Sequence, residues 1–336
     1  MSWVRPALRG LLRPVSAAYS AVVKCRASLY AKGRLKQKRL GGIVVSVGNL
    51  TVGGTGKTPM VIWLAEHFLR EGKRVAILSR GYRGADGTSD EIEVMRFRLG
   101  DRVSFGVGKN RFETGKGLEA DRIEVFLLDD GFQHLKLARD LDIVLADATR
   151  PLERERLLPG GHLREPISAL DRADIVVVTR AGALTSVEAR DSHTYSIFYA
   201  RPRLMGFRQL GGSTEEKYLS EIGLGPFFAF CGIGNPKAFF SDLKYWHVDL
   251  AGTRAFRDHH RYAKSDVRWL EEEATRAGAT ALVTTEKDAW NMRGLQFSRL
   301  PVYLCVITLE PDLEKEFVAA MDSKLASTRQ VLRQSG

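Results

Sequence analysis

A glycine-rich loop between an apolar run and an amphipathic segment determines the fold class of this chain. The apolar run is Ile43–Val47, the loop is Gly48–Thr58, and hydrophobic residues then recur at helical spacing up to Leu69. This order predicts a strand, a phosphate-binding loop and a helix, because loop N–H groups surround a phosphate and the helix N-terminus adds its positive dipole end. Lys57 would reach the β- and γ-phosphates, and Thr58 would hold Mg²⁺. The sequence therefore predicts a nucleoside triphosphate site.

The loop departs from the general motif at one position. The pattern G-x-x-x-x-G-K-[ST] has glycine where this chain has Thr51, so an ordinary glycine-rich turn is the alternative, but the flanking strand and helix favour the phosphate loop. Val52 stands where membrane-associated partitioning ATPases carry a second lysine, which disfavours their dimerising mechanism. We expect a monomer. The residues expected to bind the nucleotide are Gly53, Gly54, Thr55, Gly56, Lys57 and Thr58.

Two aspartates follow a second buried strand. Asp129 and Asp130 end the apolar run that begins at Ile123. A carboxylate at the end of a neighbouring strand commonly completes the Mg²⁺ shell of a nucleotide site, although a carboxylate turn that ends a core strand is the alternative. With a phosphate loop upstream we predict Thr58, Asp129 and Asp130 as the metal ligands, and leave open which aspartate is nearer the ion.

The positive charge of the chain is concentrated at its N-terminus. The formal net charge of the 336 residues is +11, and residues 1–40 contain ten basic residues and no acidic one. The rest of the chain is therefore nearly neutral. Within this arm, apolar residues recur on one side of a helix that we expect to be kinked at Pro14. The apolar positions are Val4, Leu8, Leu11, Leu12, Val15, Tyr19, Val22 and Val23, and the opposite side carries Arg5, Arg9, Arg13, Ser16, Ser20 and Lys24.

A basic amphipathic helix of this kind is typical of a membrane interface, with its apolar face among the lipids and its cations among anionic head groups. Its regularly spaced arginines exclude a spanning helix and a signal-peptide core. One alternative is a helix docked on the protein's own core with a solvated basic face. A nucleic-acid arm is disfavoured because no aromatic residues are interleaved with the basic ones, so we expect no nucleic-acid partner.

The remaining sequence predicts two α/β parts. From residue 43 onward apolar strands alternate with amphipathic helices, which indicates a mostly parallel sheet. Three dispersed cysteines predict neither a disulfide framework nor a zinc site, and suit a reducing, cytoplasmic setting. The expected parts are a basic arm (1–40), a P-loop domain (41–193), an extended linker or strand pair (194–224), a second, smaller α/β domain (225–310) and a C-terminal helix or tail (311–336).

With these motifs in view, the chain resembles the tetraacyldisaccharide 4'-kinases, the lipid A 4'-kinases of Gram-negative bacteria, from the arm to about Lys287. The phosphate loop with Asn49 and Thr51 is specific in combination with Gly131–His134 after two aspartates, and Thr51 is normal for this family. The other matching segments are Ser79–Gly84, Asp90-Glu91, Arg139-Asp140, Leu158–Gly160, Leu163–Pro166, Gly232–Gly234, Asp258–His260 and Thr285–Asp288.

The resemblance implies an enzyme with two α/β domains that transfers the γ-phosphate of ATP, with Mg²⁺, to the 4'-hydroxyl of a tetraacylated glucosamine disaccharide 1-phosphate in lipid A biosynthesis. It implies a peripheral protein on the cytoplasmic face of the inner membrane, held there by the arm. The competing hypothesis is a membrane-recruited P-loop ATPase or GTPase switch. It is disfavoured because the sequence has no recognisable switch loops, water-positioning residue or guanine-reading Asn-Lys-x-Asp.

The resemblance also implies residue roles. Asp90 and His259 resemble a base dyad, in which one group takes the proton of the sugar hydroxyl and the other orients the first. We expect the pKa of the His259 imidazole to be about 6.5. Without the resemblance, His259 would be a hydrogen-bonded histidine of a polar loop. Arg111, with Lys57, would stabilise charge during catalysis. The expected substrate-side residues are Asn49, Arg80, Arg83, Glu91, Gln133, His134, Arg164 and Glu165, although the two loop arginines are equally typical of solvated side chains.

Three features depart from the family pattern. Residues 152–156 replace a Gly-Asn-Gly turn, and His162 replaces a usual proline, which leaves open whether residues 152–162 alter the substrate-side loop. Ile92 follows Asp90 and Glu91 where proline is common, which leaves the backbone beside the proposed base less constrained.

Overall fold

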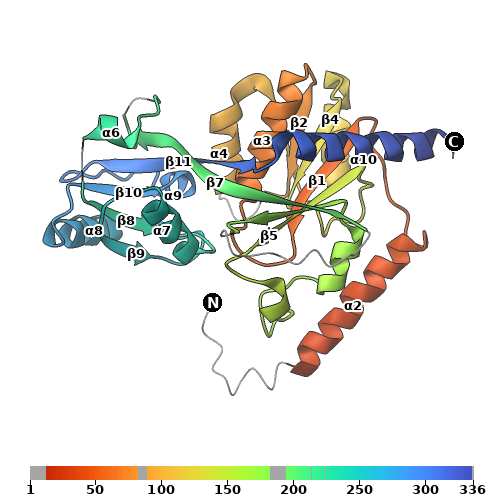
Figure 1. The fold of residues 1–336 in the computed structure, drawn as a ribbon, viewed down its shortest axis with the longest axis horizontal. Helices are drawn as coiled ribbons and strands as arrows, with labels where there is room; N and C mark the ends of the chain where they lie inside the picture. Colours follow the sequence, from red (N-terminus) through yellow and green to blue (C-terminus); the bar gives the residue numbers. More distant parts are fainter. Residues whose placement is uncertain (1–12, 82–88, 182–193, 213, 224, 335–336) are drawn as a thin grey trace. The chain divides into compact units, whose positions relative to one another are not determined.

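The structure, a computed structural model, describes residues 13–81, 89–181, 194–212, 214–223 and 225–334. The chain divides into two compact units, which are described separately (Figure 1). Unit 1 comprises residues 1–80, 101–201 and 310–336, and unit 2 comprises residues 81–100 and 202–309. Both are α/β, and the predicted fold class is confirmed.

Unit 1 contains a parallel sheet in the order β3-β2-β4-β1-β5-β6-β7. The strands are β1 (Ile43–Asn49), β2 (Val75–Ser79), β3 (Ser104–Val107), β4 (Val125–Asp129), β5 (Leu141–Asp147), β6 (Ile175–Thr179) and the first part of β7 (Ser196–Gln209). The predicted phosphate-loop strand, β1, is central and is buried from its second residue to its last. Its near-continuous apolar sequence suits a parallel strand that is covered on both faces.

Unit 1 also contains helices. They are α2 (Arg13–Ala31), α3 (Lys57–Arg70), α5 (Arg111–Leu118) and α10 (Glu314–Gln334), with the short 3₁₀ helices η1 (Gly100–Arg102), η2 (Glu119–Asp121), η3 (Leu152–Arg154) and η4 (Ile167–Arg172). Helix α3 packs across β4, β1 and β2. The ring of Trp63 on α3 meets that of Phe317 on α10 edge-to-face, with centroids 5.5 Å apart. The C-terminal helix is therefore part of unit 1.

Unit 2 contains a smaller parallel sheet in the order β11-β10-β8-β9. Its strands are β8 (Phe227–Cys231), β9 (Leu250–Ala255), β10 (Ala281–Thr285) and β11 (Val302–Pro311), and its helices are α4 (Asp90–Leu99), α6 (Leu219–Ile222), α7 (Pro236–Tyr245), α8 (Lys264–Arg276) and α9 (Glu286–Asn291). Helix α4 comes from the chain between β2 and β3, yet it packs on α9. One segment of the first half of the sequence thus belongs to unit 2.

Two parts of the chain were only coarsely anticipated. Residues 194–210 contain one strand, β7, which continues from unit 1 into unit 2. In the arm, residues 1–12 lie outside the described residues, and Arg13–Ala31 forms α2, in which no side chain is fully buried. Within the described ranges, no helix has the length and apolar character needed to cross a bilayer.

Candidate active site

The phosphate loop connects β1 to α3 at the carboxyl edge of the sheet of unit 1. Gly56 precedes the helix with φ of 92°, a left-handed conformation that glycine adopts readily. Asn49, at the end of β1, donates from Nδ2 to the carbonyl of Gly53 at 3.4 Å, and its own carbonyl accepts a hydrogen bond from Gln133 Nε2 at 3.0 Å. Asn49 and Gln133, which we expected on the substrate side, therefore contact the phosphate loop itself.

The aspartate pair lies beside this loop because β4 pairs with β1, with Asp129 opposite Val47. Gly48 makes the close approach possible: a Cβ atom there would lie 2.5 Å from Cβ of Phe132. Asp130 follows with a left-handed φ of 51°. The segment after β4 is thus held against the end of β1.

Opposite charges meet at Asp130. Lys57 Nζ lies 3.5 Å from Asp130 Oδ1, and Arg164 Nη1 donates to Asp130 Oδ2 at 2.6 Å. Burial alone would raise the pKa of the Asp130 carboxyl, but the charges of Lys57 and Arg164 outweigh it and lower the pKa to about 2. The carboxylate is therefore ionised throughout the neutral range.

Two further predicted residues lie close to this group. Arg111, at the start of α5, is only 5% exposed and donates from Nη2 to the carbonyl of Asp129 at 3.3 Å. Burial lowers the pKa of its guanidinium, although the nearby carboxylates oppose this. Burial also lowers the pKa of His134 to about 4, aided by the charge of Arg111, so this imidazole is neutral. Of Arg111 and His134, only Arg111 therefore carries a positive charge at neutral pH.

Buried polar atoms around the loop fit a polyphosphate and a divalent ion. Such atoms are normally hydrogen-bonded, yet five of them lack a hydrogen-bond partner within the described chain. They are Asn49 Oδ1, Thr55 Oγ1, Arg111 Nε, Asp130 Oδ1 and His134 Nε2. Carboxylate and hydroxyl oxygens are the donor atoms that Mg²⁺ prefers, and the hydroxyl-bearing Thr58 begins α3. The donor set therefore suits both groups.

The proposed dyad is formed within unit 2. Asp90 is the first residue of α4, which is capped by Ser89, and His259 lies in the loop after β9. His259 Nδ1 lies 2.9 Å from Asp90 Oδ2. The Asp90 side chain is 7% exposed, whereas that of His259 is 37% exposed. The imidazole is therefore the partner that can meet a substrate.

The pKa of the dyad histidine differs from the sequence-based expectation. The hydrogen bond to Asp90 raises the pKa of His259 to about 9, although burial opposes the shift. The expectation of about 6.5 assumed an ordinary imidazole, which this side chain is not.

Glu91 extends the group around the dyad. Its Oε1 lies 2.7 Å from Lys287 Nζ and 4.0 Å from His259 Nε2. Burial alone would raise the pKa of Glu91, but the charge of Lys287 holds it well below the usual range. Asn291 Nδ2 also donates to Asp90 Oδ2, at 3.3 Å. Sequence reasoning gave Lys287 and Asn291 no role, although their i, i+4 spacing on one helix face was a usable signal.

The remaining predicted residues have different surroundings. Glu165 is 4% exposed and accepts a hydrogen bond from Arg172 at 2.8 Å, so its carboxylate is engaged inside unit 1. Arg80 directly follows β2, and Arg83 lies outside the described residues. Two of the departures from the family pattern are in contact, since Glu155 Oε2 lies 2.9 Å from His162 Nδ1.

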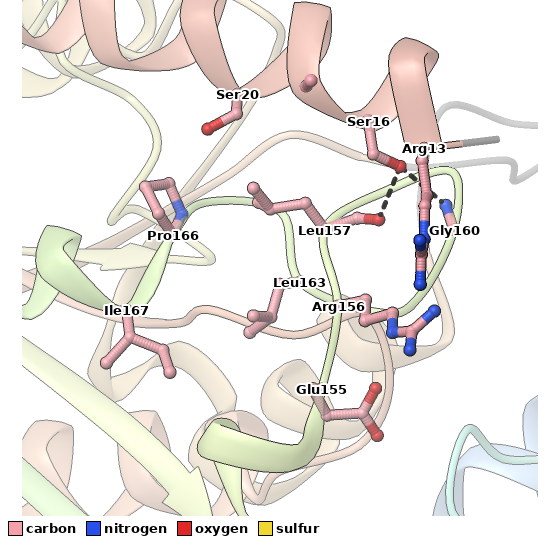
Figure 2. A pocket seen from close by; sticks show the side chains of 11 residues that line it. Arg13, Ser16, Ser20, Glu155, Arg156, Leu157, Gly160, Leu163, Pro166 and Ile167 are labelled. Carbon is pink, nitrogen blue, oxygen red and sulfur yellow. Dashed lines mark hydrogen bonds between the residues drawn. The ribbon is translucent and has the colours of Figure 1, made fainter. Parts of the chain in front are cut away.

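Helix α2 contacts the loop that carries Arg164. Ser16 Oγ donates to the carbonyl of Leu157 and accepts from the Gly160 N–H, and Tyr19 donates to the carbonyl of Arg164 at 2.9 Å. Between helix and loop is a cavity of about 450 Å³, which Figure 2 shows with the leucine and isoleucine side chains of the loop along one side. The arm is thus attached to the body by polar contacts of Ser16 and Tyr19.

The comparisons with known proteins agree over nearly the whole chain. The family model described as tetraacyldisaccharide-1-P 4'-kinase matches residues 8–326. A tetraacyldisaccharide 4'-kinase of Syntrophobacter fumaroxidans is 40% identical over 311 residues, covering 85% of this chain and 79% of the relative. One of Geobacter metallireducens is 39% identical over 338 residues, covering 94% and 98%. The structure of LpxK from Aquifex aeolicus in complex with ATP matches with a TM-score of 0.73 and 30% identity, covering 95% of this chain and 99% of that one.

Proposed function

This chain belongs to the tetraacyldisaccharide 4'-kinase family, and from that membership we propose how its residues carry out the reaction. The protein is an ATP-dependent kinase of lipid A biosynthesis, which phosphorylates the 4'-hydroxyl of a tetraacyldisaccharide 1-phosphate. A P-loop switch is not favoured, because the family match spans both units. The observation that carries the proposed mechanism is the hydrogen bond of 2.9 Å between His259 and Asp90.

At the ATP end, we assign the backbone of Gly53–Thr58 to the phosphates. Lys57 neutralises the transferring γ-phosphoryl group, and Arg111 adds a second, buried positive charge. Thr58, Asp129 and Asp130 would hold Mg²⁺, whose charge offsets that of the phosphates. Arg164 keeps Asp130 ionised and oriented by its short ion pair. Each residue acts on charge, which is the main task of a protein in phosphoryl transfer.

At the acceptor end, His259 is the base and Asp90 orients it. The half-buried imidazole accepts the 4'-hydroxyl proton at Nε2, while Nδ1–H donates to Asp90, whose carboxylate stabilises the resulting imidazolium. The hydroxyl oxygen forms its bond to the γ-phosphorus as the bond from that phosphorus to the β,γ-bridging oxygen breaks, leaving ADP. The ligand atoms of Asp90, Glu91 and His259 are close enough together to suit a metal ion. In this chain the Lys287 ammonium group pairs with Glu91 of this group.

We also assign α2 to the cytoplasmic surface of the inner membrane. What supports this is the orientation of the helix: Ser16 hydrogen-bonds to the body, while Val15 and Val22 are 51% and 67% exposed. A helix docked on the body through Val15 and Val22 would bury these side chains instead. Exposed apolar residues among basic ones are suited to a lipid interface, so the protein would be peripheral.

The direct test of the reaction uses ATP labelled at the γ-phosphate. Purified protein is incubated with acylated glucosamine disaccharide 1-phosphate or with buffer, with the Lys57→Ala protein as the control. We expect label in the lipid with the wild-type protein alone. ATP hydrolysis without labelled lipid would contradict the proposal and favour a switch.

A further inference from the structure

Helix α9 contacts both halves of the proposed dyad, and its most buried residue is Asp288. This carboxylate is fully buried, and such a charge is costly unless it is well hydrogen-bonded. Four groups donate to it: the Gly232 N–H and the Tyr262 hydroxyl, each at 2.8 Å, and the hydroxyls of Thr284 and Thr285. A residue that only capped α9 would bond within its own turn. Asp288 also holds two other segments of unit 2.

The segments that contain Gly232 and Tyr262 are both connected to His259. The carbonyl of Gly232 accepts the backbone N–H of His259 at 2.9 Å, and Tyr262 follows His259 in the same loop. His259 has a left-handed φ of 55°, a conformation that is unfavourable for residues other than glycine and is kept only where the surroundings impose it. Asp288 thus holds Gly232, which is hydrogen-bonded to the backbone of His259, and Tyr262, which follows His259 in the loop.

The other face of α9 leads to Asp90. Asn291 donates to Asp90 Oδ2, the same oxygen that is 2.9 Å from His259 Nδ1, and Lys287 pairs with the adjacent Glu91. Residues four apart lie on one helix face, so both contacts reach α4 together. One short helix therefore touches the carboxylate and the loop that carries the imidazole.

We infer that α9 is the element that aligns the dyad, with Asp288 and Asn291 as positioning residues for His259 and Asp90. The inference rests on the proposed role of the dyad. It predicts that loss of either contact weakens the hydrogen bond between imidazole and carboxylate while leaving the phosphate loop of unit 1 intact. The catalytic step should slow, and the KM for ATP should not change.

The experiment compares Asp288→Asn and Asn291→Ala with a matched control, Glu271→Gln. Glu271 is also a buried carboxylate of unit 2, and it accepts the backbone N–H groups of Ser298 and Arg299, away from the dyad. We expect kcat to fall about fivefold or more in Asp288→Asn and Asn291→Ala, as loss of one buried hydrogen bond suggests. The rising, acid-side limb of kcat/KM, which reports deprotonation of His259, should move toward lower pH in both. Glu271→Gln should lower thermal stability alone.

Two results would overturn the inference. One is loss of stability in Asp288→Asn and Asn291→Ala with wild-type kcat and pH limb, which would make α9 a structural element only. The other is a matching shift in Glu271→Gln. An Asp90→Asn protein is measured alongside to distinguish failure of the dyad from failure of the role of α9. A wild-type kcat in Asp90→Asn would reject the dyad itself. A large loss of kcat in Asp90→Asn would mean that a wild-type kcat in Asn291→Ala rejects only the role of α9.

Discussion

Charge is concentrated on a few residues at the ATP end of the site. Asp130 is held between Lys57 and Arg164, and their charges keep its pKa at about 2 in spite of burial. Around it are buried polar atoms without hydrogen-bond partners in the described chain. This is the arrangement expected where protein groups hold a highly charged ligand rather than one another.

Replacement of Lys57 tests that arrangement. Lys57→Ala removes the ammonium group from the phosphate loop, and we expect transfer to fall by about 100-fold or more. The fold should persist, because the lysine is in the loop and not in the apolar core. Steady-state turnover and circular dichroism melting curves check both points. Near-normal turnover by a folded Lys57→Ala protein would show that this loop is not the catalytic one.

The dyad makes a prediction about pH. A base must be unprotonated, and the hydrogen bond from Asp90 raises the pKa of His259 to about 9, so kcat/KM should rise with pH up to about that value. In Asp90→Asn the limb should move down toward the ordinary value of about 6.5. A profile measured from pH 6 to about 10 decides this, and an unchanged limb in Asp90→Asn would separate the carboxylate from the base.

The same shift has a consequence for stability. Because the folded-state pKa of His259 lies above its unfolded value, the pair stabilises the folded state fully below about pH 6.5. This contribution is lost as pH rises through about 9. The pH at which the base becomes active is thus the pH at which it ceases to stabilise the fold.

Among the elements, helix α2 has one side in contact with the protein body and another side exposed. Ser16 is hydrogen-bonded to the loop at Leu157 and Gly160, and Val15 and Val22 are exposed. The amphipathic pattern in the sequence predicted a helix but did not tell whether it covers the protein or a membrane. The direction in which Val15 and Val22 point favours the membrane.

The prediction at this scale is that Val22→Glu weakens binding to anionic vesicles and leaves ATP affinity unchanged, since the side chain is 67% exposed and contacts lipid in our proposal. Leu313→Glu is the matched control, because Leu313 is an exposed apolar residue of the same unit, 59% exposed, outside α2. Vesicle co-sedimentation measures both. Equal binding by the two variants would argue against α2 as the membrane contact.

Local patterns predicted the elements of unit 1 well. Strand β1 begins at Ile43, where the predicted apolar run begins, and the phosphate loop was recognised from the consecutive residues Gly48–Thr58. Helix α4 was not predicted, because its sequence has little hydrophobic periodicity and the single residue Ser89 is the only capping signal at its N-terminus. The contact of Asp90 with His259 spans 169 positions, so only the family resemblance pointed to it.

At the scale of the whole molecule, a segment from between β2 and β3 completes unit 2. Helix α4 is tied there by a buried acidic residue of α9: Glu286 pairs with Arg98 at 3.2 Å and with Arg208 at 3.1 Å. Arg208 also lies over the ring of Phe97, 4.0 Å from its centroid. A linear division of the sequence cannot reveal this exchange, because the partners of α4 lie far along the chain.

Glu286→Ala should therefore destabilise unit 2 strongly. It leaves two largely buried guanidinium groups without this carboxylate, and breaking a buried ion pair in this way costs about 3–5 kcal/mol. Urea unfolding followed by circular dichroism measures the loss. A change below about 1 kcal/mol would mean that α4 is held by other contacts.

We propose that Asp90 and His259 act as one unit in the transfer of phosphate to the lipid. The most direct measurement is a double-mutant cycle with Asp90→Ala, His259→Ala and the double variant, in which label transfer from ATP to lipid and the affinity for ATP with Mg²⁺ are measured together. We predict large losses in both single variants, little further loss in the double variant and nearly unchanged ATP affinity. Additive losses, or weakened ATP binding in His259→Ala, would contradict the account.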